Sequence, residues 1–206
     1  TLSLAYLARQ RSCALKMIGL DRRADVITHS RRVADKVGVT AHCRFASLES
    51  RAIVWQEIAQ RLLHDSGATL HAVIALHACD TATDDALILA LRQRVDFFAA
   101  APCCHAEVAH GWAQGHAGSM LEPALNDANV RRDIAANLTD VLRIESCRAH
   151  GYAVTATEFV ESEHTPKNRL IIGRRAGGQS SRRDDVERMI GLPNLYLSEQ
   201  LRSHVL

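Results

Sequence analysis

Short apolar segments alternate with longer amphipathic segments along most of this chain, and this alternation restricts the fold more than any other feature of the sequence. The shorter segments have the length of strands, and they span residues 14–21, 39–47, 69–78 and 95–101. The segments between them carry apolar residues at helical spacing, over residues 22–38, 51–65 and 81–94. Strands that alternate with helices predict an α/β protein with a parallel sheet and helices on both faces.

The last part of the chain departs from this alternation. A long helix is predicted over 129–151, and two strand-like segments follow it at 152–161 and 168–175. The loop between these strands is too short for a crossover, so they form a hairpin and the last strand is antiparallel. We therefore expect a main domain over residues 1–176, followed by a linker and a helical tail over 177–206.

Composition limits what such a domain can be. The chain has 206 residues, of which 47% are hydrophobic and 23% are charged, as in a globular domain with its own core. No run of about 18 apolar residues is present, so we expect no membrane partner. The formal charge of +2 is too small to indicate a nucleic-acid partner by itself. Scattered arginine doublets are typical of solvated helix ends and lean only slightly toward RNA.

Six cysteines lie mostly in or beside apolar segments, at Cys13, Cys43, Cys79, Cys103, Cys104 and Cys147. This pattern favours buried free thiols over a disulfide framework, and it predicts a cytoplasmic protein because thiols persist in a reducing compartment.

Polar and sulfur-bearing residues follow four of the expected strands. They are Asp21 after the first strand, FASLES at 45–50, HACD at 77–80 and PCCH at 102–105. An open α/β sheet binds its ligands at the carboxyl ends of the strands, so we expect these four segments to line one crevice. Within the third segment, Thr81 is predicted to cap the next helix, with Asp84 in its first turn.

Three motifs resemble those of class I S-adenosylmethionine-dependent methyltransferases, namely LHACDTATDDAL at 76–87, APCCH at 101–105 and HTPKN at 164–168. More narrowly, the chain is similar to a methyltransferase-domain family shared by bacterial proteins and eukaryotic methyltransferase-like proteins. The resemblance implies a Rossmann-like sheet, mostly parallel with an antiparallel last strand, and S-adenosylmethionine as the cofactor.

The resemblance also implies roles for particular residues. Asp21 would hold the cofactor ribose, although it could also cap the next helix, and Ala46 and Ser47 would lie near the adenine. His77 and Ala78 would lie near the methionine part of the cofactor. If the acceptor must lose a proton, Asp80 or His77 is the candidate base. The residues expected to face the acceptor are Pro102, Cys103, Cys104, His105, Lys167 and Asn168.

One expected motif is missing from the chain. Methyltransferases of this class carry a glycine-rich turn of the DxGxGxG kind after their first strand, and no such segment occurs in the 206 residues. Because the sequence starts at Thr1 inside a helix-like segment, we expect it to be a fragment whose first strand lies upstream.

Three interpretations of the cysteine cluster remain open: structural thiols, a metal site, and thiols that contact the substrate or act as nucleophiles. The zinc deaminase pattern, H-x-E followed by P-C-x-x-C, is not met. Adjacent cysteines such as Cys103 and Cys104 also chelate one ion poorly. We therefore favour structural thiols and predict no metal ligand.

The leading functional hypothesis is a methyltransferase whose acceptor is RNA, protein or a small molecule. A non-catalytic binding domain on the same fold is the main alternative, because fold does not determine function. A metal-dependent hydrolase or deaminase that uses the His and Cys cluster is a weaker one. The sequence does not indicate an oligomeric state.

Overall fold

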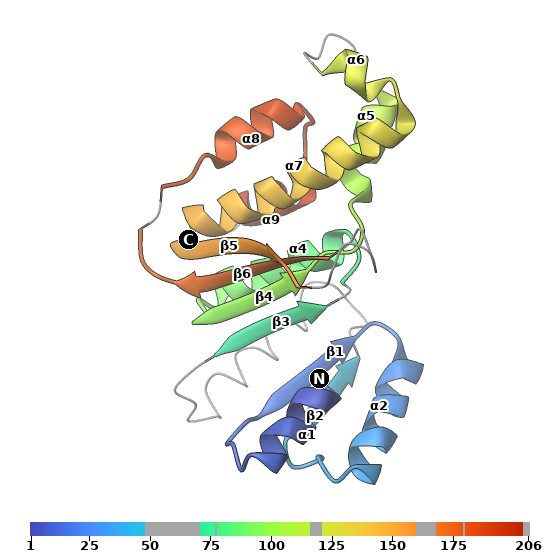
Figure 1. The fold of residues 1–206 in the computed structure, drawn as a ribbon, viewed down its shortest axis with the longest axis vertical. Coiled ribbons are helices and arrows are strands. Elements are labelled where there is room, and N and C mark those ends of the chain that lie inside the picture. Colours follow the sequence, from blue (N-terminus) through green and yellow to red (C-terminus); the bar gives the residue numbers. More distant parts are fainter. Residues whose placement is uncertain (48–70, 77, 116–120, 160–167, 179, 204–206) are drawn as a thin grey trace. The chain divides into compact units, whose positions relative to one another are not determined.

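A computed structural model of the protein (Figure 1) describes residues 1–47, 71–76, 78–115, 121–159, 168–178 and 180–203. The chain divides into two compact units, Thr1–Ala68 and Thr69–Leu206, and each is described by itself. The predicted helix at 51–65 lies outside the described residues, as do His77 and Lys167.

The first unit is a pair of parallel strands with two helices. Its elements are α1 (Leu2–Gln10), β1 (Met17–Asp21), α2 (Ala24–Lys36) and β2 (Cys43–Ser47). In the parallel register, Met17 lies opposite Cys43 and Asp21 lies opposite Ser47, so both strands end at the same edge. The prediction of two strands separated by a helix is confirmed for this unit.

A small core holds the first unit together. Its buried residues are Ala5, Ala34, Val39 and Cys43. The helix α2 ends one residue before Val37, and Gly38 follows with a φ of 69°. This left-handed conformation strongly favours glycine, so the predicted stop of the helix at Gly38 is confirmed.

The second unit contains a four-stranded sheet with the order β3-β4-β6-β5. Its strands are β3 (Ala72–Leu76), β4 (Phe97–Ala101), β5 (Tyr152–Glu158) and β6 (Arg169–Arg175). Strands β3 and β4 are parallel, whereas β6 runs antiparallel to both β4 and β5. The predicted α/β class, with its antiparallel last strand, is confirmed.

Helices of the second unit pack on this sheet and on one another. They are α4 (Thr81–Arg92), α5 (Ala106–Gln114), α6 (Glu122–Leu125), α7 (Ala128–Ala149), α8 (Arg183–Ile190) and α9 (Tyr196–Arg202). Figure 1 shows α7 as the longest of them, running along the sheet. Residues from every helix and strand between α4 and α9 contribute to one apolar core, so the C-terminal tail is part of the folded unit.

One glycine of the second unit lies inside a helix. Gly111 is part of α5, which continues to Gln114, and Leu192 occupies the space next to the missing side chain. A Cβ at Gly111 would lie 2.5 Å from Cδ1 of Leu192. The short helix α6 precedes α7.

The strand β3 is less buried than its continuous apolar sequence suggests. Ile74 and Leu76 are 49% and 59% exposed, while Val73 and Ala75 pack against the core. Among the described strands β3 pairs only with β4, so it forms one edge of the sheet. No helix in the described part of the chain has the length and apolar character needed to cross a membrane.

Candidate active site

In the first unit, three predicted cofactor residues lie together at the carboxyl ends of β1 and β2. Asp21 is opposite Ser47, and Leu20 is opposite Ala46. Oδ1 of Asp21 accepts a hydrogen bond from the backbone N–H of Arg23 at 2.8 Å, which fixes the turn that leads into α2. The other carboxylate oxygen has no hydrogen-bond partner among the described residues. Asp21 therefore supports the turn and keeps one oxygen for a ligand.

In the second unit, the HACD and PCCH loops begin side by side. Leu76 at the end of β3 lies opposite Ala101 at the end of β4 in the parallel register. Oδ1 of Asp80 accepts the backbone N–H of Ala106 at 2.9 Å and that of Glu107 at 3.4 Å. Asp80 thus caps α5 from the neighbouring loop, because the first N–H groups of a helix lack partners within it. This bond joins the two loops.

The backbone at Asp80 is strained. Its φ is 51° and its ψ is −123°, a combination that side chains rarely adopt. Such a conformation costs about 1–3 kcal/mol and persists where the surrounding structure imposes it, most often at functional sites.

The predicted cap of α4 is wrong. The N-cap residue of α4 is Asp80, not Thr81, and its side chain does not bond to α4. Thr83 donates its hydroxyl to the carbonyl of Ala78. Asp84 is fully buried and faces Arg143 on α7. The acidic residue in the first turn serves a tertiary ion pair rather than a capping box.

Arg143 is the centre of a buried polar network beneath the two loops. Its Nε donates to Oδ1 of Asp84 at 2.7 Å, and its Nη2 donates to Oδ2 at 3.3 Å. Nη2 also donates to the carbonyl of Asp80 at 2.9 Å, and Nη1 donates to Asp140 at 3.2 Å. Burial by itself would lower the pKa of Arg143, but Asp84 and Asp140 outweigh it and raise the pKa. The guanidinium is therefore permanently charged, and it holds the HACD loop from below.

Asp140 connects this network to the PCCH loop. One oxygen accepts Nε2 of His105 at 2.7 Å, and the other accepts Nη1 of Arg169 at 2.7 Å. Burial favours the protonated carboxyl, but His105, Arg143 and Arg169 together hold the pKa of Asp140 below its usual value. Asp140 is an ionised anchor for three donors.

His105 is held in one orientation by this anchor. Its side chain is 5% exposed, and its Nδ1 has no hydrogen-bond partner among the residues that the structure describes.

Three thiols converge above the network. Sγ of Cys79 lies 3.2 Å from Sγ of Cys103, which in turn lies 3.8 Å from Sγ of Cys104. Burial, together with the two neighbouring thiols, raises the pKa of Cys103 to about 12. A nucleophilic cysteine needs a lowered pKa, so this environment argues against that role for Cys103.

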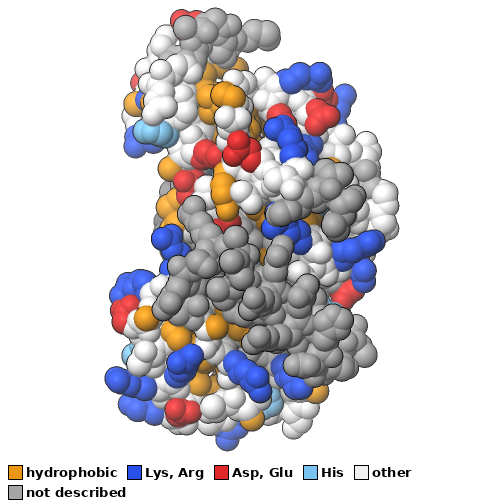
Figure 2. Space-filling view, turned by 180° about the vertical axis from the view of Figure 1, so that it is seen from behind, with side chains coloured by type: hydrophobic (Ala, Val, Ile, Leu, Met, Phe, Trp, Pro, Cys, Tyr) orange, Lys and Arg blue, Asp and Glu red, His pale blue; other side chains and the backbone are white. Residues whose placement is uncertain are grey.

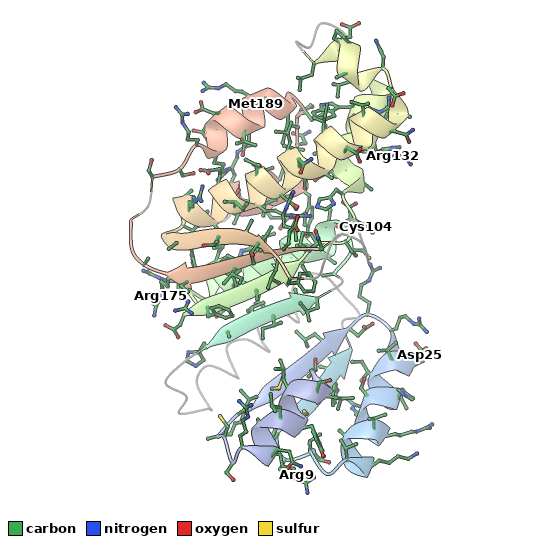
Figure 3. All side chains as sticks on the ribbon, viewed as in Figure 1. Arg9, Asp25, Cys104, Arg132, Arg175 and Met189 are labelled. Atoms are coloured by element: carbon green, nitrogen blue, oxygen red, sulfur yellow. The ribbon has the colours of Figure 1, made fainter. Side chains whose placement is uncertain are left out.

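The exposure of the cysteines corrects the sequence interpretation in part. None of the six forms a disulfide, and Cys43 and Cys147 are buried as expected. Cys13, Cys79 and Cys104, however, are exposed. Figure 3 shows Cys104 just beyond the end of β4, at the side of the sheet opposite to Arg175.

The remaining predicted acceptor residues divide into buried and undescribed positions. Pro102 is buried at the end of β4. Asn168 is 6% exposed, and its carbonyl accepts the N–H of Phe159 at 3.1 Å, so its backbone closes the β5–β6 hairpin. His77 and Lys167 lie outside the described residues.

Sequence reasoning missed Asp140 and Arg143, which organise the second unit's site. The signal that could have identified them is their position on α7. Both are charged, yet they belong to the buried face of that helix, which also carries Ala135, Thr139, Leu142 and Ser146. Charged residues on a buried face need partners, and such pairs are candidates for site-organising networks.

Parallel strands connected by helices, with β6 antiparallel, define an α/β fold of the Rossmann-like methyltransferase class. A family model described as a methyltransferase domain matches residues 1–111, which is more than half of the chain. The chain therefore belongs to this family of methyltransferase domains. The match includes Asp21 and both loops of the second unit. No curated protein and no solved structure matches the chain.

Proposed function

We propose that the protein transfers the methyl group of S-adenosylmethionine to a nucleophilic acceptor. The observation that carries the proposal is the position of the polar residues: in each unit they gather at the carboxyl ends of adjacent parallel strands, where an α/β sheet binds its ligand. The family membership agrees with this chemistry. The proposal includes the narrower family with the HACDTATD and APCCH motifs.

Methyl transfer from a sulfonium is an in-line displacement, so the enzyme mainly aligns the partners and excludes water. In the proposed arrangement Asp21 binds the ribose, Ala46 and Ser47 border the adenine, and His77 and Ala78 border the methionine part. Pro102–His105 then face the acceptor, together with Lys167 and Asn168.

Asp80 is the proposed base for an acceptor that must lose a proton, with His77 as the alternative. Oδ1 of Asp80 accepts hydrogen bonds from the first N–H groups of α5, whereas Oδ2 of Asp80 has no hydrogen-bond partner among the described residues. The strained backbone and the bonds to α5 hold the carboxylate in place, which suits a group that must meet a proton at one position.

RNA is the acceptor class that the charge distribution favours. The first unit carries 11 Lys and Arg against 6 Asp and Glu, a net charge of +5, and Figure 2 shows Lys and Arg side chains spread over one face of it. Arg22 and Arg32 are exposed and have no ionic partner in the described part of the chain. We also propose a cytoplasmic location, which the six cysteines without a disulfide support. Mass spectrometry of RNA and protein from cells with and without the gene identifies the acceptor, and a methyl mark lost from protein alone would contradict RNA.

The cofactor assignment is tested by changing Asp21→Ala and titrating the protein with S-adenosylhomocysteine calorimetrically. Loss of charge-assisted hydrogen bonds to the ribose should weaken binding by about 1–3 kcal/mol. The control is Asp25→Ala, since Asp25 is exposed and pairs with Arg23 on the same unit. Equal affinities of the two variants would refute the ribose assignment. Absence of binding in the unchanged protein would instead favour a non-catalytic domain.

A further inference from the structure

The thiols of Cys79, Cys103 and Cys104 come from two loops that are far apart in sequence, and their Sγ atoms all lie within 4.8 Å of one another. Cys79 precedes α4, and the other two follow β4. We propose that these three thiolates bind one divalent ion of the zinc class, with a fourth coordination position open to solvent or to a ligand.

The distances suit such an ion. A Zn–S bond of about 2.3 Å in a tetrahedral site places neighbouring sulfurs roughly 3.8 Å apart. The separation between Cys103 and Cys104 is 3.8 Å and matches this spacing, whereas that between Cys79 and Cys103 is 3.2 Å and must widen when the ion binds. Adjacent cysteines usually point to opposite sides, but here both Sγ atoms turn toward Cys79. The sequence argument against chelation by this pair therefore does not apply to the folded loop.

Convergence of three thiols favours an ion over a disulfide. A disulfide between Cys79 and Cys103 would use two of the thiols and would leave the third, Cys104, outside the bond. Three thiolates carry three negative charges, so a divalent ion leaves a smaller uncompensated charge than a monovalent one. Metal binding to thiols releases their protons, so the ion would displace protons from the cluster.

The number of ligands predicts the type of site. Structural zinc is held by four protein ligands, whereas sites with three protein ligands keep one exchangeable position. In the described part of the chain no further His, Cys, Asp or Glu belongs to this cluster. Cys79 and Cys104 are exposed, so the fourth position faces outward.

The loops beneath the thiols are already fixed by protein contacts. Asp80 ties the HACD loop to the start of α5, and Arg143 holds the carbonyl of Asp80 from α7. The thiols are therefore presented on loops whose positions do not depend on an ion, and preorganised ligands cost less entropy on binding.

The test is a titration of the reduced chain with Zn²⁺ in competition with a chromogenic chelator. We expect one equivalent to bind, and Cd²⁺ to produce the ultraviolet charge-transfer band of thiolate ligation. Cys79→Ser and Cys104→Ser should each weaken binding by more than about 100-fold, because even outer partners of metal ligands are worth about 10–100-fold. Both side chains are exposed, so these variants should fold, and circular dichroism verifies it.

The matched control is Cys13→Ser, which removes an exposed thiol of the first unit and should leave the affinity unchanged. Two results would overturn the proposal. One is the absence of stoichiometric Zn²⁺ binding to the reduced, folded protein. The other is a triple variant, with Cys79, Cys103 and Cys104 all changed to Ser, that binds Zn²⁺ as tightly as the unchanged protein. Neither result bears on cofactor binding through Asp21, which is measured separately.

Discussion

The two units of the chain achieve their structure by different means. The first unit, Thr1–Ala68, has a described core of four small or medium side chains. The second unit, Thr69–Leu206, has one continuous core to which every element from α4 to α9 contributes. Beside that core the second unit also buries charged groups, with Arg143 completely inaccessible.

The units also differ in charge. The first has a net charge of +5, whereas the second has 14 Lys and Arg against 17 Asp and Glu, a net charge of −3. The formal charge of the whole chain, +2, conceals this asymmetry. Among the described residues, the second unit thus supports its loops with a continuous core and a buried polar network, whereas the first unit presents a basic surface over a smaller core.

Arg143→Met tests whether the buried polar network stabilises the second unit, and its expected effect is the largest. It leaves Asp84 buried without its cationic partner and removes one of the three donors to Asp140, which should lower the free energy of unfolding by about 3–5 kcal/mol in denaturant titrations. The control Arg188→Met removes an exposed pair with Asp185 and should cost less than about 1 kcal/mol. Comparable losses in both variants would contradict the role of the buried network.

Substitutions at two glycines, one in each unit, test how tightly the two cores are packed. A Cβ at Gly173 would lie 2.1 Å from Phe98, which is 1% exposed and packs against Tyr152 with ring centroids 5.3 Å apart. A Cβ at Gly19 would lie 2.6 Å from Phe45, which is only partly buried.

Gly173→Ala should therefore destabilise the protein by about 1–3 kcal/mol, because the buried ring has no room to move. Gly19→Ala should cost less, since the ring of Phe45 can turn toward solvent. Thermal and denaturant unfolding measure both values. A larger loss at Gly19 would reverse the ranking of the two cores.

The smallest expected effect concerns pH. The native pKa of Asp140 is held below its usual value, so its contribution to stability is present above the pKa of the unfolded chain, about 3.9, and is lost as the pH falls through the lower native value. Asp140→Asn should therefore reduce the loss of stability on acidification below about pH 5, measured by unfolding at several pH values.

The control for this titration lies in the first unit. Arg23 lowers the pKa of Asp25 through a hydrogen bond, but both side chains are exposed. Salt screens such a pair, so at high ionic strength Asp25→Asn should leave the acid dependence unchanged. An equal change in both variants would mean that the burial of Asp140 does not increase its effect on stability at low pH.

Much of the secondary structure was predictable because its signals are local. The period of apolar residues identified α2, α4 and α7, and Gly38 marked the end of α2. Short apolar runs identified β1, β3 and β4, and a short connection predicted the antiparallel pair β5–β6. The loops of the candidate site could also be predicted, because carboxyl ends of parallel strands meet at one edge.

The partners of the polar side chains were not predictable in the same way. Asp84 has the position of a capping residue, and only the approach of α7 makes it the partner of Arg143, which is 59 residues away. Asp80 looked like a base at the mouth of a crevice, and the fold also makes it the cap of a helix that starts 26 residues later.

The sequence alone thus determined the order and type of most elements and the class of the fold, because periodicity and turn residues act over a few neighbouring positions. Only the tertiary structure decided which carboxylate faces which cation, and that Cys79 meets Cys103 across 24 residues of chain. Such encounters depend on how helices and strands pack. A buried charge selects its partner from whatever the packing brings within about 3 Å, since leaving it alone would cost several kcal/mol.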